Sequence, residues 1–134
     1  MKTGYYQYTD GSKSKALSKD KELAGIICNV TDSHMIVIAP FEGENLTYDE
    51  AQSFGKDKGY RCPTIDELTG IYLNKDKINA SLEAAGLPKL KEWFYWSSTE
   101  YISTLRGVLD MNNGYRSSNF KDDDNNYVRP VLAL

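Results

Sequence analysis

The chain has 134 residues, of which 40% are hydrophobic and 26% charged, and its formal net charge is −3. This length and composition predict a single globular domain, residues 1–134, that can bury a core without help from disulfides. The negative charge and the lack of a basic stripe disfavour nucleic-acid binding, because such binding depends on contacts with phosphates.

The amino-terminal part of the chain is polar and carries no targeting signal. Residues 1–6 lack the apolar core of a signal peptide, so either the protein stays inside its cell or the leader is missing. The longest apolar run, residues 35–41, is too short to span a bilayer. Within residues 1–22, the segment 9–12 (TDGS) predicts a turn.

Residues 23–31 (LAGIICNVT) and 34–40 (HMIVIAP) predict a β-hairpin that turns at Asp32 and Ser33. The second strand is apolar on both faces, so we expect it to run through the core. His34 is the only histidine. At the mouth of a hairpin, and without an evident partner in the sequence, it is expected to be a turn residue rather than a metal ligand or catalytic base.

Two capping boxes, each a Thr followed three residues later by a Glu, predict helix starts at Thr47 and Thr64. The first helix is expected over residues 48–58, ending at Gly59, and the second over residues 65–73. A third helical segment is expected over residues 75–85. The carboxylates of the second helix's first turn fit capping and the helix dipole, so we do not interpret them as catalytic.

The two cysteines, Cys28 and Cys62, are too far apart in sequence for a zinc knuckle or a C-x-x-C redox site. Both lie in apolar contexts, which favours buried, unreactive thiols. A disulfide between them remains an alternative, although no compartment signal supports one.

Two apolar strands, residues 95–101 (YWSSTEY) and 127–134 (YVRPVLAL), flank a long polar run in the last third of the chain. Pro130 restricts the second strand to a sheet edge or an irregularity. Within the run, residues 105–111 predict a strand and residues 112–114 (NNG) a tight turn. The order of elements indicates an α+β fold, with antiparallel strands, two or three helices grouped on one side and a long polar C-terminal loop region.

Catalytic and metal-binding groups are sparse. Ser97 and Ser98 have no histidine near them in sequence, which argues against serine hydrolase chemistry. Residues 122–126 (DDDNN) offer oxygen ligands for calcium, but consecutive aspartates cannot all point at one ion. We therefore favour a solvated or target-facing acidic loop, and we expect neither a metal nor a cofactor.

Several segments resemble one protein family. Residues 59–68 (GYRCPTIDEL), 95–101 (YWSSTEY) and 128–131 (VRPV) are similar, in this order, to signatures of C-type lectin-like domains related to the formylglycine-generating enzyme. Residues 4–6 (GYY), Asp10-Gly11 and residues 25–27 (GII) also resemble its amino-terminal pattern. The resemblance covers most of the chain and implies a C-type lectin-like fold. It does not imply the enzyme's activity, because the chain has no cysteine after Cys62, whereas that enzyme uses a later cysteine pair.

The sequence departs from the family pattern at two places. Cys62 stands where the family usually has an apolar residue, which suggests a core position. Residues 105–107 (LRG) stand where the family often has an Ala-Trp pair, so the packing there is expected to differ.

Several members of this family are variable proteins of diversity-generating retroelements, in which reverse transcription replaces template adenines near the end of the gene. Substitution of Asn codons of the form AAY yields many residue types but never Glu, Gln, Lys, Trp or Met. Residues 102–127 fit this set apart from Met111 and Lys121, and the pairs 112–113 and 125–126 look like unaltered Asn template. The alternative is an ordinary solvated loop, since such loops are also rich in Asn and Asp.

The resemblance therefore implies a binding protein without catalytic activity, whose variable region, residues 102–127, contacts a macromolecular target, either a protein or a surface glycan. We expect the contacts to come from Ile102, Thr104, Arg106, Leu109, Asn112, Tyr115, Arg116, Asn119, Phe120, Asp122, Asp124 and Tyr127. Arg129 is expected to pair with Glu100 and to join the two motif strands beneath this surface.

Two other functions stay open from the sequence. The first is a fixed, adhesin-like module of the same fold that binds carbohydrate or protein at a cell surface. The second is a small enzyme whose missing groups come from a partner chain. Display on a bacterial cell or a phage particle and the oligomeric state are likewise left open.

Overall fold

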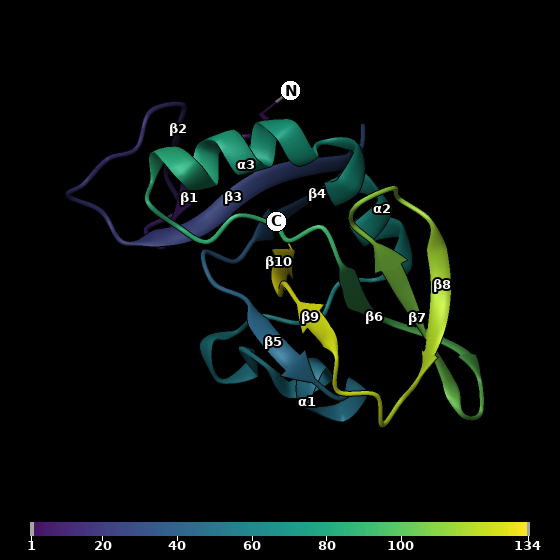
Figure 1. Cartoon of the computed structure of the whole chain (residues 1–134). Coiled ribbons are helices and arrows are strands. Elements are labelled where there is room, and N and C mark those ends of the chain that lie inside the picture. Colours follow the sequence, from purple (N-terminus) through teal and green to yellow (C-terminus); the bar gives the residue numbers. More distant parts are fainter. Residues whose placement is uncertain (1, 134) are drawn as a thin grey trace.

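Two five-stranded sheets form the framework of the domain (Figure 1). The computed structural model describes residues 2–133. The first sheet has the strand order β10-β4-β3-β1-β2 and is antiparallel throughout. Its strands are β1 (Tyr6–Tyr8), β2 (Lys13–Ser14), β3 (Leu23–Thr31), β4 (His34–Ile38) and β10 (Val131–Ala133).

The predicted β3–β4 hairpin is confirmed, and it forms the centre of the first sheet. Gly25 of β3 is essential because its backbone lies directly against the end of β4. Its φ angle is +153°, and a Cβ atom there would lie 2.0 Å from the Ile38 carbonyl oxygen. Only glycine fits this close approach of two backbones. The predicted turn over residues 9–12 is also present, closed by a hydrogen bond from the Tyr8 amide to the Ser12 carbonyl.

The second sheet has the order β5-β9-β6-β7-β8, and its one parallel pairing joins β6 to β9. Most of the polar run that was expected to be a loop belongs to this sheet, because two hairpins give its residues regular backbone partners. The strand predicted over residues 105–111 is confirmed as β7, whereas the expectation of a loop was wrong for residues 116–120. The strands are β5 (Gly43–Leu46), β6 (Phe94–Ile102), β7 (Leu105–Asp110), β8 (Arg116–Phe120) and β9 (Asn126–Val128).

Both capping boxes form as predicted, with Thr47 and Thr64 as the N-cap residues. Helix α2 spans Ile65–Leu73 as predicted, and α3 spans Lys75–Ala84. Helix α1, Tyr48–Ser53, is shorter than expected because Phe54 adopts an extended conformation and packs edge-on against Phe41. The chain then forms a separate 3-10 turn, η1 (Lys56–Lys58). Across residues 2–133 we find no helix with the length and apolar character needed to cross a membrane.

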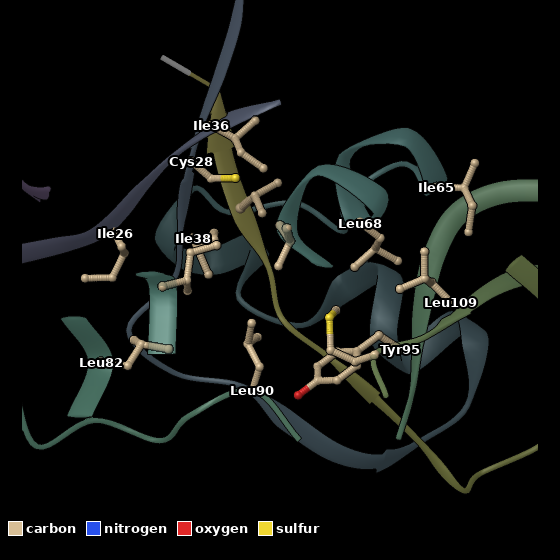
Figure 2. Packing of buried hydrophobic residues seen from close by; sticks show 14 of the residues in the cluster. Ile26, Cys28, Ile36, Ile38, Ile65, Leu68, Leu82, Leu90, Tyr95 and Leu109 are labelled. Carbon is tan, nitrogen blue, oxygen red and sulfur yellow. The ribbon is translucent and has the colours of Figure 1, made fainter. Parts of the chain in front are cut away.

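The core consists of two clusters that lie on opposite faces of the second sheet. The larger fills the space between the first sheet, α2, α3 and β6–β7, and Figure 2 shows it extending from Ile26 and Leu82 to Tyr95 and Leu109. The smaller joins α1 to the other face through Tyr48, Trp96, Val108 and Val128, among others. The central parts of β6 and β7 are thus buried on both faces. The molecule is an α+β domain in which α1 packs on the opposite face of the second sheet from α2 and α3.

The thiols of Cys28 and Cys62 are free and buried, as predicted. Cys28 Sγ lies 3.7 Å from the Gly70 carbonyl oxygen, and Cys62 Sγ lies 3.4 Å from that of Trp96. Burial raises the pKa of each thiol to about 12, so both are protonated and unreactive at neutral pH.

His34 has a partner that the sequence did not indicate. Its Nε2 atom lies 2.7 Å from Oε2 of Glu67, whose carboxylate also accepts two hydrogen bonds of 2.7 Å from Arg61. Glu67 completes the α2 capping box as well, by accepting the Thr64 amide at 2.9 Å. Burial alone would raise the pKa of Glu67, but the hydrogen bonds from Arg61, Thr64 and His34 outweigh it and lower the pKa to about 2.

We predict that Glu67 makes the stability of the domain acid-sensitive. Because its pKa is about 2 when folded, compared with an ordinary value of 4.5, its contribution is complete above about pH 5 and is lost as the pH falls towards 2. This contribution is on the order of 3 kcal/mol. At pH 7, Glu67→Gln should have a lower free energy of unfolding than the wild type. Urea unfolding should then show that the variant loses less stability than the wild type as the pH falls towards 2.

The matched control is Glu50→Gln, which changes the same capping-box position in α1, where the carboxylate is exposed and forms no ion pair with any of residues 2–133. This variant should keep the pH dependence of the wild-type protein. Equal pH dependence in the wild type and Glu67→Gln would show that Glu67 does not supply the acid sensitivity.

Candidate binding surface

The two motif strands lie side by side beneath the predicted binding region. Tyr95 of β6 pairs with Tyr127 of β9, and Tyr95, Trp96 and Val128 are fully buried. The chain leaves β9 at Val128, passes Arg129 and Pro130, and enters the first sheet as β10. Pro130 therefore occupies the step between two sheets, which fits the irregularity that its ring requires.

Arg129 pairs with Glu42 and not with Glu100, so our expectation for its partner was wrong. Its Nη1 donates to Glu42 Oε1 at 3.1 Å and to the Pro88 carbonyl at 2.8 Å, and its Nε donates to the Ala39 carbonyl at 2.8 Å. Glu100 lies at the exposed end of β6, where its Oε1 is 3.9 Å from Arg106. The buried guanidinium needs a carboxylate that is buried with it, and Glu42 meets that requirement.

Glu42 gathers further donors around this ion pair. Its Oε1 accepts the Tyr95 hydroxyl at 2.9 Å, and its Oε2 accepts the Lys91 ammonium at 3.0 Å. Burial lowers the pKa of Arg129, an effect that Glu42 opposes, while burial and Glu42 both raise the pKa of Tyr95. The network joins the β4–β5 loop, the segment before β6 and the β9–β10 step into one rigid base.

The β7–β8 hairpin rises from this base and closes at the predicted turn. The Gly114 amide donates to the Asp110 carbonyl at 2.7 Å, and the Asn112 amide donates to the Asp110 carboxylate at 2.9 Å. Gly114 has a φ angle of +79°, and a Cβ atom there would lie 2.5 Å from the Tyr72 ring of α2. The turn is thus fixed both by its backbone conformation and by its contact with α2.

Eight of the twelve predicted contact residues have exposed side chains. Tyr115, Phe120 and Ile102 expose 73%, 62% and 61% of their surface, respectively, which is unusual for large apolar side chains. All eight lie on the β6–β7 tip, the β7–β8 turn, β8 or the loop after it. They are Ile102, Thr104, Asn112, Tyr115, Arg116, Phe120, Asp122 and Asp124.

The sheet register brings three apolar residues into one row near the β6–β7 tip. Ile102 of β6 pairs with Leu105 of β7, which in turn pairs with Phe120 of β8. Paired residues of antiparallel strands point to the same face with their Cβ atoms about 5 Å apart. Ile102, Leu105 and Phe120 are called the apolar row below.

The four remaining predicted residues are less accessible, and one lies in the core. Leu109 is 0% exposed because its position in β7 turns the side chain towards α2, so it was wrongly placed at the surface. Tyr127 is partly buried and stacks on Tyr95 with ring centroids 5.5 Å apart. Asn119 is also partly buried.

Arg106 has a structural environment. Its guanidinium lies 5.1 Å from the centre of the Tyr48 ring, and its Nη1 donates to the Ile102 carbonyl at 2.9 Å. The side chain is only 12% exposed. Arg106 therefore holds the β6–β7 tip, whereas Arg116 reaches the surface of α2, where it pairs with Asp66 at 2.7 Å.

The loop after β8 ends the surface with acidic side chains. Its start is held by hydrogen bonds from the Lys121 amide to the Thr104 carbonyl and from the Asp123 amide to the Phe120 carbonyl. Its end is held by Trp93, whose indole donates to the Asn125 carbonyl at 2.9 Å. No group of three or more His, Cys, Asp or Glu side chains within residues 2–133 is arranged to hold a metal ion.

Tyr101 and Trp93 are exposed aromatic residues at or near this surface that sequence reasoning missed. Tyr101 lies within the YWSSTEY segment (residues 95–101). Because the first residues of this segment belong to the core, the whole segment was expected to support the surface and not to form part of it. The polar character of the segment after Trp96 was the available signal, since it marks where β6 leaves the core.

No protein-family model matches the sequence of this chain, and no match was found among curated proteins. Its function must therefore be inferred from its own residues.

We predict that Arg129→Ala strongly destabilises the domain, because it removes the fully buried cation of Glu42, leaves only the part-exposed Lys91 to pair with that carboxylate, and leaves the Ala39 and Pro88 carbonyls without their donor. The expected loss is about 3–5 kcal/mol in the free energy of unfolding, measured by urea denaturation. Glu100→Gln is the control and should change stability by less than about 1 kcal/mol, since Glu100 is exposed. A wild-type unfolding curve for Arg129→Ala would contradict the role of this ion pair.

Proposed function

We propose that this protein binds a macromolecular target through a diversified C-terminal surface carried on a C-type lectin-like scaffold, as in the variable proteins of diversity-generating retroelements. The variable region is residues 102–127. The proposed activity is recognition, with no catalytic step and no bound cofactor.

The observation that carries this proposal is how residues 102–127 divide between surface and core. Met111, one of two residues in this run that adenine substitution in an AAY codon cannot produce, is fully buried in the larger cluster. The exposed positions carry residue types within the reachable set, Lys121 excepted. Diversification that spares the core and varies the surface gives this distribution.

The architecture supports a C-type lectin-like scaffold. The residues of the three motifs that resemble this family hold the framework: Thr64 and Glu67 cap α2, Trp96 is fully buried in the smaller cluster, and Arg129 pairs with Glu42 in the interior. A surface that tolerates variation requires such a base, whose stability does not depend on the varied side chains.

The environments of the candidate catalytic groups favour binding over catalysis. Ser97 is fully buried and donates its hydroxyl to the Gly107 carbonyl at 2.7 Å, while His34 contacts Glu67 on a different part of the molecule. A nucleophile and its base must lie within hydrogen-bond reach of each other, and these two have other partners.

A fixed binding module of the same fold is the second candidate. Two observations favour it: Lys121 is exposed although it falls outside the reachable set, and Asn126, which looked like unaltered template, is buried. The DNA around the gene distinguishes the two functions.

We predict a near-copy of the segment that encodes residues 95–134 beside a reverse transcriptase gene, with mismatches confined to template adenines. The mismatches should fall in codons of exposed residues, such as Tyr115 and Phe120, while the codons of buried Val108, Leu109 and Met111 match the copy. Sequencing of the locus provides the measurement. Absence of the copy and of the reverse transcriptase gene would leave the fixed module as the better description.

We also predict that Tyr115→Ala combined with Phe120→Ala removes target binding and leaves the melting temperature nearly unchanged, because both side chains are exposed. Binding can be measured with the labelled domain on glycan and protein arrays, scored on the features that the wild type binds. Met35→Ala removes an exposed apolar side chain from the other sheet and should bind like wild type. Retained binding by the double variant would place the interface elsewhere.

A further inference from the structure

We propose that the open edge of β8 recognises its target by pairing with an extended, basic and apolar segment of a protein, which adds a strand to the second sheet. This inference rests on the proposed function and specifies its partner class and binding mode. Figure 1 shows β8 as the outermost strand beside β7.

The hydrogen-bond pattern of the β7–β8 hairpin determines which backbone groups face outwards. The Asp110 amide donates to the Tyr115 carbonyl, and the Lys121 amide donates to the Thr104 carbonyl. Hydrogen-bonded pairs alternate along an antiparallel ladder, so residues 117 and 119 also face β7. The amides of Arg116, Ser118 and Phe120, and the carbonyls of Arg116 and Ser118, therefore point away from the sheet.

The other three sheet edges in residues 2–133 are protected, whereas β8 is not. Strand β2 has only two residues, and β5 has an irregular register between Gly43 and Leu46. The outer side of β10 is covered by Arg61, which exchanges two backbone hydrogen bonds with Val131. Short strands, irregular register, covering segments, Lys and Pro are the features that proteins use to prevent pairing at a sheet edge. Strand β8, in contrast, has five residues in unbroken register with β7 and contains neither Lys nor Pro.

The side chains around this edge indicate the composition of the incoming segment. Phe120 lies at the edge and continues the apolar row, so it can contact apolar side chains on one face of an added strand. Residues 121–124 (KDDD) follow directly after β8, and their one positive and three negative charges sum to −2, so this end of the edge attracts Lys or Arg. A second copy of the chain carries the same net charge of −3, so the charge complementarity favours a basic partner segment.

The test uses an array of capped heptapeptides in which Lys or Arg alternates with Val, Ile, Leu, Tyr or Phe. Each peptide is matched by one of the same sequence with N-methyl groups on the alternate amides of one edge and by another methylated on the opposite edge. We expect binding by a subset of unmodified peptides, with methylation of one edge weakening it about tenfold or more, because a backbone donor is lost.

Two substitutions at one position provide the protein side of the test. Ser118→Pro removes an outward-facing amide without removing a hydrogen bond to β7, whereas Ser118→Ala keeps that amide. Peptide affinity should fall about tenfold for Ser118→Pro and stay near the wild-type value for Ser118→Ala. Amide exchange of labelled wild-type protein should slow at residues 116, 118 and 120 when peptide binds, an observation that does not depend on either variant folding.

The possible results separate this inference from the proposed function. Absence of binding by every peptide, or equal affinity for N-methylated and unmodified peptides, would overturn the strand-addition mode. Wild-type dimerisation in sedimentation experiments that is abolished in Ser118→Pro would also overturn it, in favour of a second copy at this edge. A template copy and a reverse transcriptase gene found with any of these results would leave the diversified binding function standing.

Discussion

The buried ion pair between Arg129 and Glu42 is the interaction on which the rest of this structure depends. The fully buried guanidinium needs this carboxylate, and hydrogen bonds from Tyr95 and from Lys91, a second cation, complete the shell of Glu42. The pair connects segments from both halves of the chain at the point where the last strands move from one sheet to the other. It thereby fixes the orientation of the two sheets and the position of β6, which carries the exposed hairpin.

Burial of β6 and β7 on both faces separates the stability of the domain from the composition of its surface. Trp96 and Val108 contribute to one cluster, and Tyr95 and Leu109 contribute to the other. The strand beyond them, β8, contributes few core side chains, so its residues can change without opening a cavity. Arg106 is the exception within the tip, since it packs on Tyr48 and supports the backbone from below.

Much of the fold could be predicted because its signals are local. The capping boxes at Thr47 and Thr64, the β3–β4 hairpin and the burial of both cysteines all follow from short stretches of sequence. The partners of Arg129 and His34 could not be predicted in this way, since Glu42 and Glu67 approach them only through tertiary packing. Within the candidate surface, exposure of Tyr115 and Phe120 agreed with the expectation. Leu109 did not, because its side-chain direction depends on the register of β7, which a short sequence pattern does not fix.

The position of β10 has a consequence for how the protein is made. This strand pairs with β4, and Arg129 just before it completes the interior, so residues that follow the hairpin in sequence are needed to close a core begun much earlier. A chain that stops or shifts frame within the hairpin therefore lacks both Arg129 and β10, which leaves Glu42 without the guanidinium buried beside it and the edge of β4 without its partner strand.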